Sequence, residues 1–211
     1  MKFPKERDSR FLRKEVDTYG IETIPMNHFP VMLDVGANVG VISMLSRIFH
    51  PAMKILAFEP APTTFECLND NVAGMGIDTV NAAFFDGTDV CIHYKSRSCS
   101  NKVRKAEPEE DVPIKSYTLT SLVEEFGITP EETLLKMDCE GGEYAMLTNT
   151  GDFELLGRFG YIAMEIHVRR GRRGPLAFID KFVKAHHQRD TSIIFGRAGH
   201  MVSSLERLNR R

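Results

Sequence analysis

The stretch that decides the fold is VMLDVGANVGVISMLSRIFHPAMKILAFEP, residues 31–60. It predicts a short apolar strand, Val31–Val35, followed by a glycine-rich turn over residues 36–40. Apolar residues then recur at helical spacing over Val41–Phe49, and a second apolar run covers Ile55–Phe58. Together they predict a βαβ unit of about thirty residues, the size of a nucleotide-binding half of a doubly wound sheet.

The residues of the turn narrow the ligand. A dinucleotide fingerprint has glycines at its first, third and sixth positions, so that backbone amides can approach a pyrophosphate. Here Gly36, Asn38 and Gly40 occupy the first, third and fifth places, and asparagine tolerates the left-handed backbone that such a turn needs. Asp34 stands two residues before the first glycine, where it would repel a pyrophosphate. A cationic ligand without phosphate, such as S-adenosylmethionine, fits this pattern better.

A second acid supports the same ligand. Glu59, at the end of the second strand and 19 residues after Gly40, is placed to accept hydrogen bonds from both hydroxyls of a ribose. The alternative is a plain strand-to-helix turn in some other α/β protein. The predicted cofactor-binding residues are Asp34, Gly36, Ala37, Asn38, Gly40, Glu59, Pro60, Asp86 and Asp138.

Length and composition predict one soluble domain. The 211 residues carry 27 Lys plus Arg and 29 Asp plus Glu, so the net charge of −2 gives no general attraction to nucleic acid or membrane. The four cysteines form no CxxC pair, which argues against zinc and against a disulfide framework. We find no apolar run long enough to span a bilayer and no secretory leader, so we expect a cytoplasmic protein.

Strand and helix patterns alternate through most of the chain and predict an α/β fold with a mainly parallel, doubly wound sheet. We divide it into an appendage (1–29), a cofactor and catalytic core (30–167) and a C-terminal helix with final strands (168–211). Helices are predicted at 9–19, 63–72, 119–126, 144–156 and 175–184, and strands at 79–85, 90–94, 134–138, 161–167, 192–195 and 200–203. The polar stretch 96–111 is predicted to be a solvated loop, with a lid as the alternative.

Acids stand at the ends of five predicted strands, at Asp34, Glu59, Asp86, Asp138 and Glu165, and ligands bind at such ends. Asp86 could bond the adenine amine or serve as an ordinary Asp-Gly turn residue. If the strands that end at Asp138 and His167 are neighbours with level ends, Lys136 lies beside Glu165, and Asp138 lies beside His167. We therefore predict a buried Lys136–Glu165 pair beneath an Asp138–His167 dyad, with His167 as general base and Asp138 as its orienter. These four residues are the predicted catalytic residues.

Two alternatives remain for these residues. His167 could be a hydrogen-bonded residue that holds a loop. Asp138, Glu140, Glu165 and His167 could instead form an oxygen-rich site for magnesium or manganese. We favour no metal, because Lys136 already supplies positive charge within the cluster.

Several motifs resemble the FkbM-type methyltransferases over about residues 31–167: LDVGANVG, AFEP, LNDNV, NAAFFD, LLKMDCEGGEYAML and MEIH. The resemblance implies the class I, Rossmann-like fold with a seven-stranded sheet that has helices on both faces and includes an antiparallel strand. It implies methyl transfer from S-adenosylmethionine, typically to an oxygen of a sugar or other secondary metabolite. Cys139 and Gly142 depart from the family pattern, which usually has an aliphatic residue and alanine there.

A basic run, VRRGRRG, follows His167 directly. It is either a solvated loop or a clamp for a phosphate or carboxylate on the acceptor, and arginine geometry suits the clamp. Arg169, Arg170 and Arg172, together with Glu140, are the predicted substrate-binding residues. Nucleic acid is disfavoured as a partner, because no aromatic ladder accompanies the run.

The sequence thus predicts an S-adenosylmethionine-dependent O-methyltransferase that acts on a hydroxyl of a small metabolite or sugar. The alternatives are a non-catalytic cofactor-binding or scaffold protein and a nicotinamide-dependent oxidoreductase, which the glycine spacing and Asp34 disfavour.

Overall fold

The main sheet has seven strands in the order β11-β10-β9-β8-β1-β2-β3. The computed structural model describes residues 1–2, 26–93, 102–106, 112–139, 142–165, 192–197 and 200–202. The strands are β1 (Val31–Val35), β2 (Lys54–Phe58), β3 (Asp78–Val80), β8 (Thr133–Met137), β9 (Tyr161–Glu165), β10 (Ser192–Arg197) and β11 (His200–Val202). All neighbouring pairs run parallel except β10 and β11, which are antiparallel. The predicted α/β class and the seven-stranded sheet with an antiparallel strand are confirmed.

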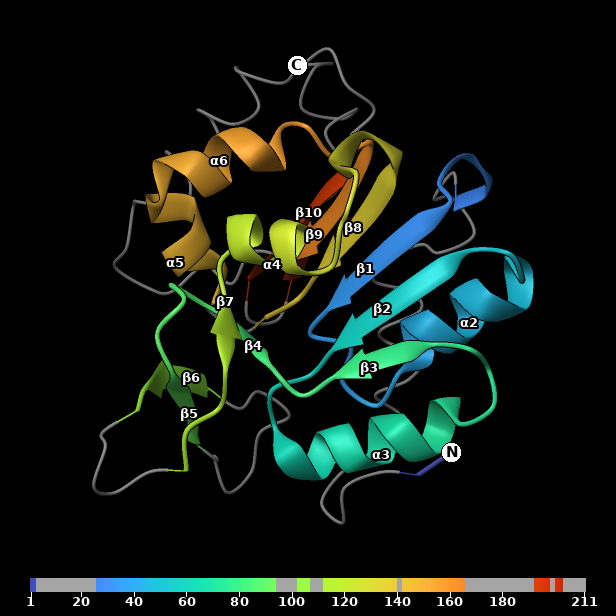
Figure 1. Ribbon diagram of the computed structural model, residues 1–211, viewed down its shortest axis with the longest axis horizontal. Helices are drawn as coiled ribbons and strands as arrows, with labels where there is room; N and C mark the ends of the chain where they lie inside the picture. The colour runs from blue at the N-terminus through green and yellow to red at the C-terminus, as the bar shows by residue number, and fades with distance from the viewer. Residues whose placement is uncertain are drawn as a thin grey trace.

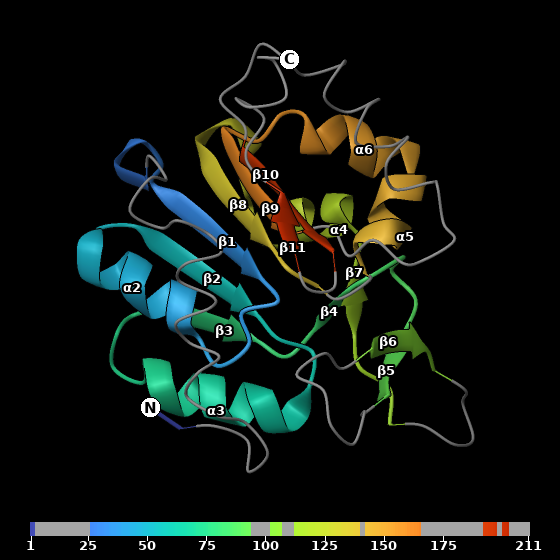
Figure 2. The ribbon, with the colours of Figure 1, turned by 180° about the vertical axis from the view of Figure 1, so that it is seen from behind.

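Helices lie on both faces of this sheet (Figures 1 and 2). The first face packs against α2 (Val41–Phe49) and α3 (Pro62–Val72) through two clusters that contain Met32, Ile42, Ala57 and Leu68. The second face packs against α4 (Leu119–Glu125) and α6 (Thr150–Leu156), with α5 (Glu143–Thr148) directly before α6. Short 3-10 turns, η2 (Met26–His28) and η3 (Pro130–Glu132), precede β1 and β8.

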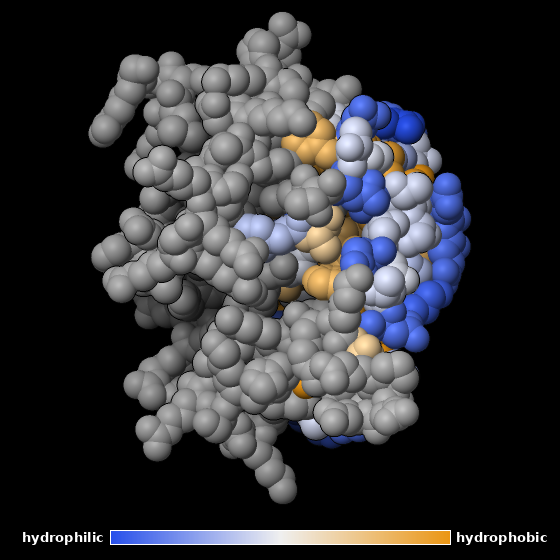
Figure 3. All heavy atoms as spheres, turned by 90° about the vertical axis from the view of Figure 1, so that its left-hand side faces the viewer, coloured by the Kyte–Doolittle hydropathy of each residue, from blue (hydrophilic) through white to orange (hydrophobic). Residues whose placement is uncertain are grey.

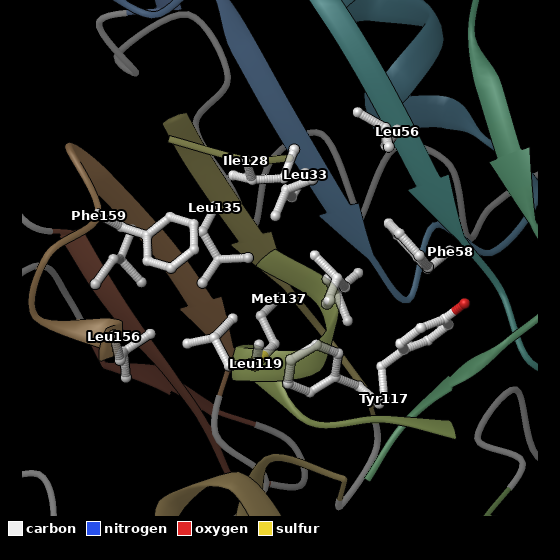
Figure 4. Packing of buried hydrophobic residues seen from close by; sticks show 14 of the residues in the cluster. Leu33, Leu56, Phe58, Tyr117, Leu119, Ile128, Leu135, Met137, Leu156 and Phe159 are labelled. Carbon is white, nitrogen blue, oxygen red and sulfur yellow. The ribbon is translucent and has the colours of Figure 1, made fainter. Parts of the chain in front are cut away.

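Central strands are apolar on both sides, as expected when helices cover both faces of a parallel sheet. Successive side chains point to opposite faces, so Met32 joins the α2 side, while Leu33 joins the α4 side. Figure 4 shows the larger cluster, in which side chains from β1, β2, β8 and β9 of the main sheet, and from β4 (Ala83–Phe84) and β7 (Ser116–Tyr117), meet residues of α4 and α6. The same alternation places Asp34 and Lys136 on the α2 side, behind the cofactor loop (residues 36–40).

The prediction of a single third strand over 79–85 was wrong, because the structure has two short strands there. β3 ends at Val80, and β4 leaves the main sheet to pair with β7. The cause is a tight turn, since the amide of Ala82 donates to the carbonyl of Val80 at 3.1 Å. The division turns the chain toward the β7–α4 unit (residues 116–127).

Two other predictions needed correction. The crossover helix predicted at 144–156 is two helices, because the side chain of Asn149 accepts from the amide of Asp152 and starts α6 afresh. Part of the polar stretch predicted as loop, Lys102–Lys105, is strand β6, which pairs antiparallel with β5 (Val90–His93). The helices predicted at 9–19 and 175–184 lie outside the described residues.

Candidate functional site

The cofactor loop connects β1 to α2 at the carboxyl end of the sheet. Gly36, Asn38 and Gly40 have φ angles of +76°, +55° and +89°. Among the non-glycine residues that the structure describes, Asn38 is the one with a positive φ. The prediction that this asparagine adopts a left-handed backbone conformation is therefore confirmed.

Gly36 is fixed by tertiary packing as well as by its backbone angle. A Cβ at Gly36 would lie 1.8 Å from the carbonyl oxygen of Asp138, at the end of β8. The amide of Asp138 also donates to the carbonyl of Val35 at 2.9 Å. The loop and the end of β8 are therefore interlocked through their backbones.

Most of the loop's N–H groups are already used inside the protein. Gly36 and Ala37 both donate to the carbonyl of Phe58, at 2.9 and 2.8 Å, and Gly40 donates to Ala37 at 2.9 Å. Asn38 donates to Oε2 of Glu59 at 3.0 Å. A loop that holds a pyrophosphate keeps such amides for the ligand. In this loop the same amides donate to the backbone of Phe58 and Ala37 and to the carboxylate of Glu59.

Glu59 joins the loop to the start of α3. The residue is buried at 8% exposure, and its Oε1 accepts from the amide of Ala61 at 3.0 Å. Asn81, which follows β3, donates to the carbonyls of Glu59 and Pro60 at 2.8 and 3.1 Å. Sequence reasoning missed Asn81, because the predicted strand 79–85 placed this residue inside a strand, whereas β3 ends at Val80.

Asp34 and Lys136 form a buried ion pair. They are opposite one another on the neighbouring strands β1 and β8, with 3.0 Å between Lys136 Nζ and Asp34 Oδ1. Their side chains are 2% and 0% exposed. Lys136 also donates to the carbonyl of Gly36 at 2.8 Å, and Ser43 Oγ donates to Asp34 Oδ2 at 2.6 Å. The charge of Asp34, which we expected to attract a cationic ligand, is thus balanced within the protein.

The predicted register at the ends of β8 and β9 was wrong by two residues. The strands are neighbours, but Lys136 lies beside Ala163, and Met137 lies beside Met164. Asp138 is therefore level with Glu165 and not with His167. The premise that paired Lys136 with Glu165 fails, because β9 extends further past the end of β8 than level ends would allow.

The turn after β8 is as tightly packed as the cofactor loop. A Cβ at Gly142 would lie 2.3 Å from the carbonyl oxygen of Phe84, so alanine, common here in the family pattern, does not fit this chain without movement. Cys139 Sγ lies 3.6 Å from Oε2 of the buried Glu143. Burial raises the pKa of the Cys139 thiol well above its usual value, and the charges of Glu143 and Asp138 raise it further.

Asp86 takes part in a turn. Its Oδ1 accepts from the amide and the hydroxyl of Thr88, at 3.1 and 2.5 Å, and the side chain is exposed. This is the turn role that the sequence offered as one of two readings. An adenine contact through Asp86 stays a prediction.

Several predicted site residues lie outside the described residues, namely Glu140, His167, Arg169, Arg170 and Arg172, as do residues 96–101 and 107–111 of the predicted lid. Within the described ranges, no group of three or more His, Cys, Asp or Glu side chains is arranged to hold a metal ion. Nor does any helix in that part of the chain combine the length and apolarity needed to cross a bilayer. The metal alternative includes Glu140 and His167, which lie outside the described residues, so it stays a prediction.

Figure 3 views the molecule from the side toward which the carboxyl ends of β1 and β2 point in Figure 1. Apolar and weakly polar residues reach the surface near the middle of this face, and strongly hydrophilic residues lie along its edge. The described residues of the cofactor loop and of the β8 turn belong to this carboxyl end of the sheet.

Residues 34–191 match the family model described as the methyltransferase FkbM domain. The chain belongs to the FkbM methyltransferase family. The match begins at Asp34 and includes the cofactor loop, Glu59, Lys136 and Asp138. The sequence resemblance to this family is therefore confirmed.

Named relatives agree with this assignment. Methyltransferase sdnD of Sordaria araneosa is 41% identical over 69 residues, which are 31% of this chain and 26% of that protein. The 31-O-demethyl-FK506 methyltransferase FkbM of Streptomyces tacrolimicus is 36% identical over 70 residues, 30% of this chain and 26% of that protein. These matches span about a quarter of each relative's length.

A longer match is the hexuronic acid methyltransferase AglP of Haloferax volcanii, 29% identical over 161 residues, which are 75% of this chain and 64% of that protein. Among solved structures, the precorrin-6y C5,15-methyltransferase of Geobacter metallireducens has a TM-score of 0.44 and 13% identity, and the match covers 89% of this chain and 77% of that one.

Proposed function

We propose that this FkbM-family chain is an S-adenosylmethionine-dependent methyltransferase that methylates a hydroxyl of a small metabolite or sugar. The observation that carries the proposal is the use of the loop amides. Four of them, from Gly36, Ala37, Asn38 and Gly40, donate to acceptors inside the protein. A site of this kind suits a ligand held by shape and by a ribose contact better than a ligand held by its phosphates.

The residues around the cofactor loop suit S-adenosylmethionine. Glu59 holds a carboxylate against the cofactor loop at Asn38, where it would repel a pyrophosphate and accept from ribose hydroxyls with its remaining lone pairs. Asn81 and Ala61 hold the same segment from its other side. The nicotinamide alternative is disfavoured on these contacts. The proposed cofactor residues are the loop, Asp34 behind it, Glu59, Pro60, Asp86 and Asp138.

When bound, S-adenosylmethionine supplies an electrophilic methyl group. The chain's task is then to place an acceptor oxygen in line and to remove its proton. We assign the proton transfer to His167 and keep Asp138 in the catalytic set as a carboxylate at the same edge of the sheet, no longer as the direct neighbour of His167. Glu165, which the register places level with Asp138, is the second carboxylate at this edge. His167→Ala and Asp138→Asn variants should bind S-adenosylhomocysteine normally and lose turnover, and full turnover would contradict the assignment.

The acceptor is proposed to be anionic. Glu140, Arg169, Arg170 and Arg172 would recognise it, and arginine suits a carboxylate or phosphate. The relative AglP is named for a hexuronic acid, and the relative FkbM for a 31-O-demethyl compound, which supports an acidic acceptor and an oxygen target. Turnover on a uronic acid glycoside but not on its neutral hexose counterpart would support this, and the reverse preference would contradict it.

The first experiment is a thermal shift of the purified protein with S-adenosylhomocysteine, NAD and NADP. Stabilisation by S-adenosylhomocysteine alone is expected, since a ligand that binds only the folded state raises its stability. Stabilisation by a dinucleotide alone would contradict the proposal. Binding of S-adenosylhomocysteine without methyl transfer to any hydroxylated acceptor would favour the non-catalytic alternative.

A further inference from the structure

Lys136 is an unusual residue for a central strand. It lies on β8 between Leu135 and Met137, which are both fully buried, and is itself only 2% exposed. A lone ammonium in such a place is strongly unfavourable, so a lysine here needs a partner. The partner carboxylate, Asp34, stands directly across on β1.

The pair does more than neutralise two charges. Lys136 Nζ donates to the carbonyl of Gly36, the first residue of the cofactor loop, at 2.8 Å, and this contact joins residues that are 100 positions apart in sequence. Ser43, in the first turn of α2, donates to the other oxygen of Asp34 at 2.6 Å. The pair therefore reaches both the start of the loop and the helix that follows it.

The far side of the loop is held independently. The carbonyl of Phe58 accepts from Gly36 and Ala37, and Glu59 accepts from Asn38, so the end of β2 and the residue after it fix the N–H groups, while Lys136 of β8 fixes a carbonyl. Because the amides have acceptors on β2, removal of Lys136 should loosen the loop without unfolding it, provided that Asp34 is neutralised at the same time.

We propose that Lys136 is a positioning residue for cofactor binding, which acts through the carbonyl of Gly36, and that Asp34 is the internal counter-charge of Lys136. This inference rests on the proposed cofactor and revises the predicted catalytic role of Lys136. Asp34 then does not recognise the cofactor's positive charge. Lys136 sets the position of the loop in advance, so that the ligand meets a formed surface.

The test compares a single and a double variant, in which charged side chains are replaced by uncharged side chains of similar size. Lys136→Met alone leaves a buried, unpaired carboxylate and is expected to fold poorly. The double variant Asp34→Asn/Lys136→Met removes both charges and keeps the approximate size of both side chains, and an exposed-pair control is Glu125→Gln/Lys115→Met. The measurements are melting temperature, hydrogen exchange of the loop amides and the Kd for S-adenosylhomocysteine and S-adenosylmethionine.

The double variant should melt close to the wild type and exchange its loop amides about tenfold faster, as expected from loss of one charge-assisted hydrogen bond. Its Kd should rise by about the same factor for both ligands, so the ratio of the two Kd values should stay unchanged. The control variant should match the wild type in loop exchange and in both Kd values.

Wild-type loop exchange in the double variant would overturn the proposal, as would loss of affinity for S-adenosylmethionine alone, which would make Asp34 the counter-charge of the ligand. Unfolding of the double variant would also overturn it, because the pair would then support the whole fold. The exchange measurement needs no ligand. Failure of the wild type to bind S-adenosylhomocysteine would therefore count against the proposed cofactor while the role of Lys136 was still tested.

Discussion

The cofactor loop and the β7–α4 unit each contain a glycine with positive φ and each lie next to a lysine–carboxylate ion pair, but one pair is buried and the other is exposed. At the loop the pair is Lys136 with Asp34, at 2% and 0% exposure. At β7–α4 the pair is Lys115 with Glu125, at 56% and 48% exposure and a similar separation of 2.8 Å. The N–O separations are similar, so we attribute the stability difference that we expect between the two pairs to their burial.

The glycines repeat the contrast. Gly36 and Gly127 have φ angles of +76° and +60°. A Cβ on Gly36 would meet backbone of Asp138, whereas a Cβ on Gly127 would meet nothing within 4 Å. The same residue type thus meets a packing requirement in one region and only a conformational one in the other.

The largest expected effect comes from the glycines. Gly36→Ala should cost about 4 kcal/mol or more, because rigid backbone blocks the added methyl. Gly127→Ala should cost about 1 kcal/mol, the penalty for a left-handed non-glycine residue alone. Urea unfolding of both variants checks this. Equal losses would show that conformation, and not contact with Asp138, explains Gly36.

The next largest expected effect is a difference in stability between variants of Lys136 and Lys115. Lys136→Met should lower the free energy of unfolding by about 3–5 kcal/mol, since Asp34 is left buried and unpaired. Lys115→Met should leave the melting temperature unchanged, because its pair is exposed to water. Added salt should screen the Lys115 pair and leave the Lys136 pair largely unaffected. A large loss in Lys115→Met would contradict the contrast.

Substitutions of Glu59 and Glu125 should differ in their effect on ligand binding. Glu59→Gln should weaken S-adenosylhomocysteine binding about 10- to 100-fold, the range for loss of a charge-assisted hydrogen bond. Glu125→Gln, in the β7–α4 unit, is the matched control and should leave the Kd unchanged. Calorimetric titration of both variants gives the comparison, and a normal Kd for Glu59→Gln would remove Glu59 from the site.

The smallest expected effect is a pH dependence. Burial raises the pKa of the Cys139 thiol, and burial followed by the hydrogen bond to Glu125 raises the pKa of Tyr117. Each group then stays protonated in the folded state when the unfolded chain has ionised, so stability falls as pH rises above the unfolded value, about 8.5 for cysteine and about 10 for tyrosine.

Cys139→Ala should therefore flatten the loss of stability that begins near pH 8.5, and Tyr117→Phe should flatten only the loss above about pH 10. Denaturant unfolding across this pH range measures both slopes. An unchanged slope in Cys139→Ala would show that the thiol ionises as readily in the fold as in the unfolded chain.

Local sequence was sufficient to predict the part of the site between β1 and the end of β2. The boundaries of β1 and α2, the left-handed turn at Asn38 and the acid at the end of β2 all follow from spacing within one continuous stretch of thirty residues. Such features depend on backbone preferences and apolar periodicity, which neighbouring residues determine. Asn81 was missed because its function depends on a turn that ends β3 early.

The part of the site at the ends of β8 and β9 was harder to predict. The register of β8 and β9 differs by two residues from level ends, and this single shift moves Asp138 from beside His167 to beside Glu165. Side chains alternate along a strand, so a two-residue shift keeps every residue on its face and leaves no trace in the hydrophobic pattern.

By itself, the sequence determined the α/β class, the βαβ unit, the form of the cofactor loop and membership of the FkbM methyltransferase family. Only the tertiary structure decided that Lys136 pairs with Asp34, that Gly36 must be glycine because of Asp138, and that β4 leaves the main sheet for β7. The reason is distance along the chain. Contacts such as that between Lys136 and Gly36 join residues 100 positions apart, and they depend on strand order and register, which no local pattern specifies.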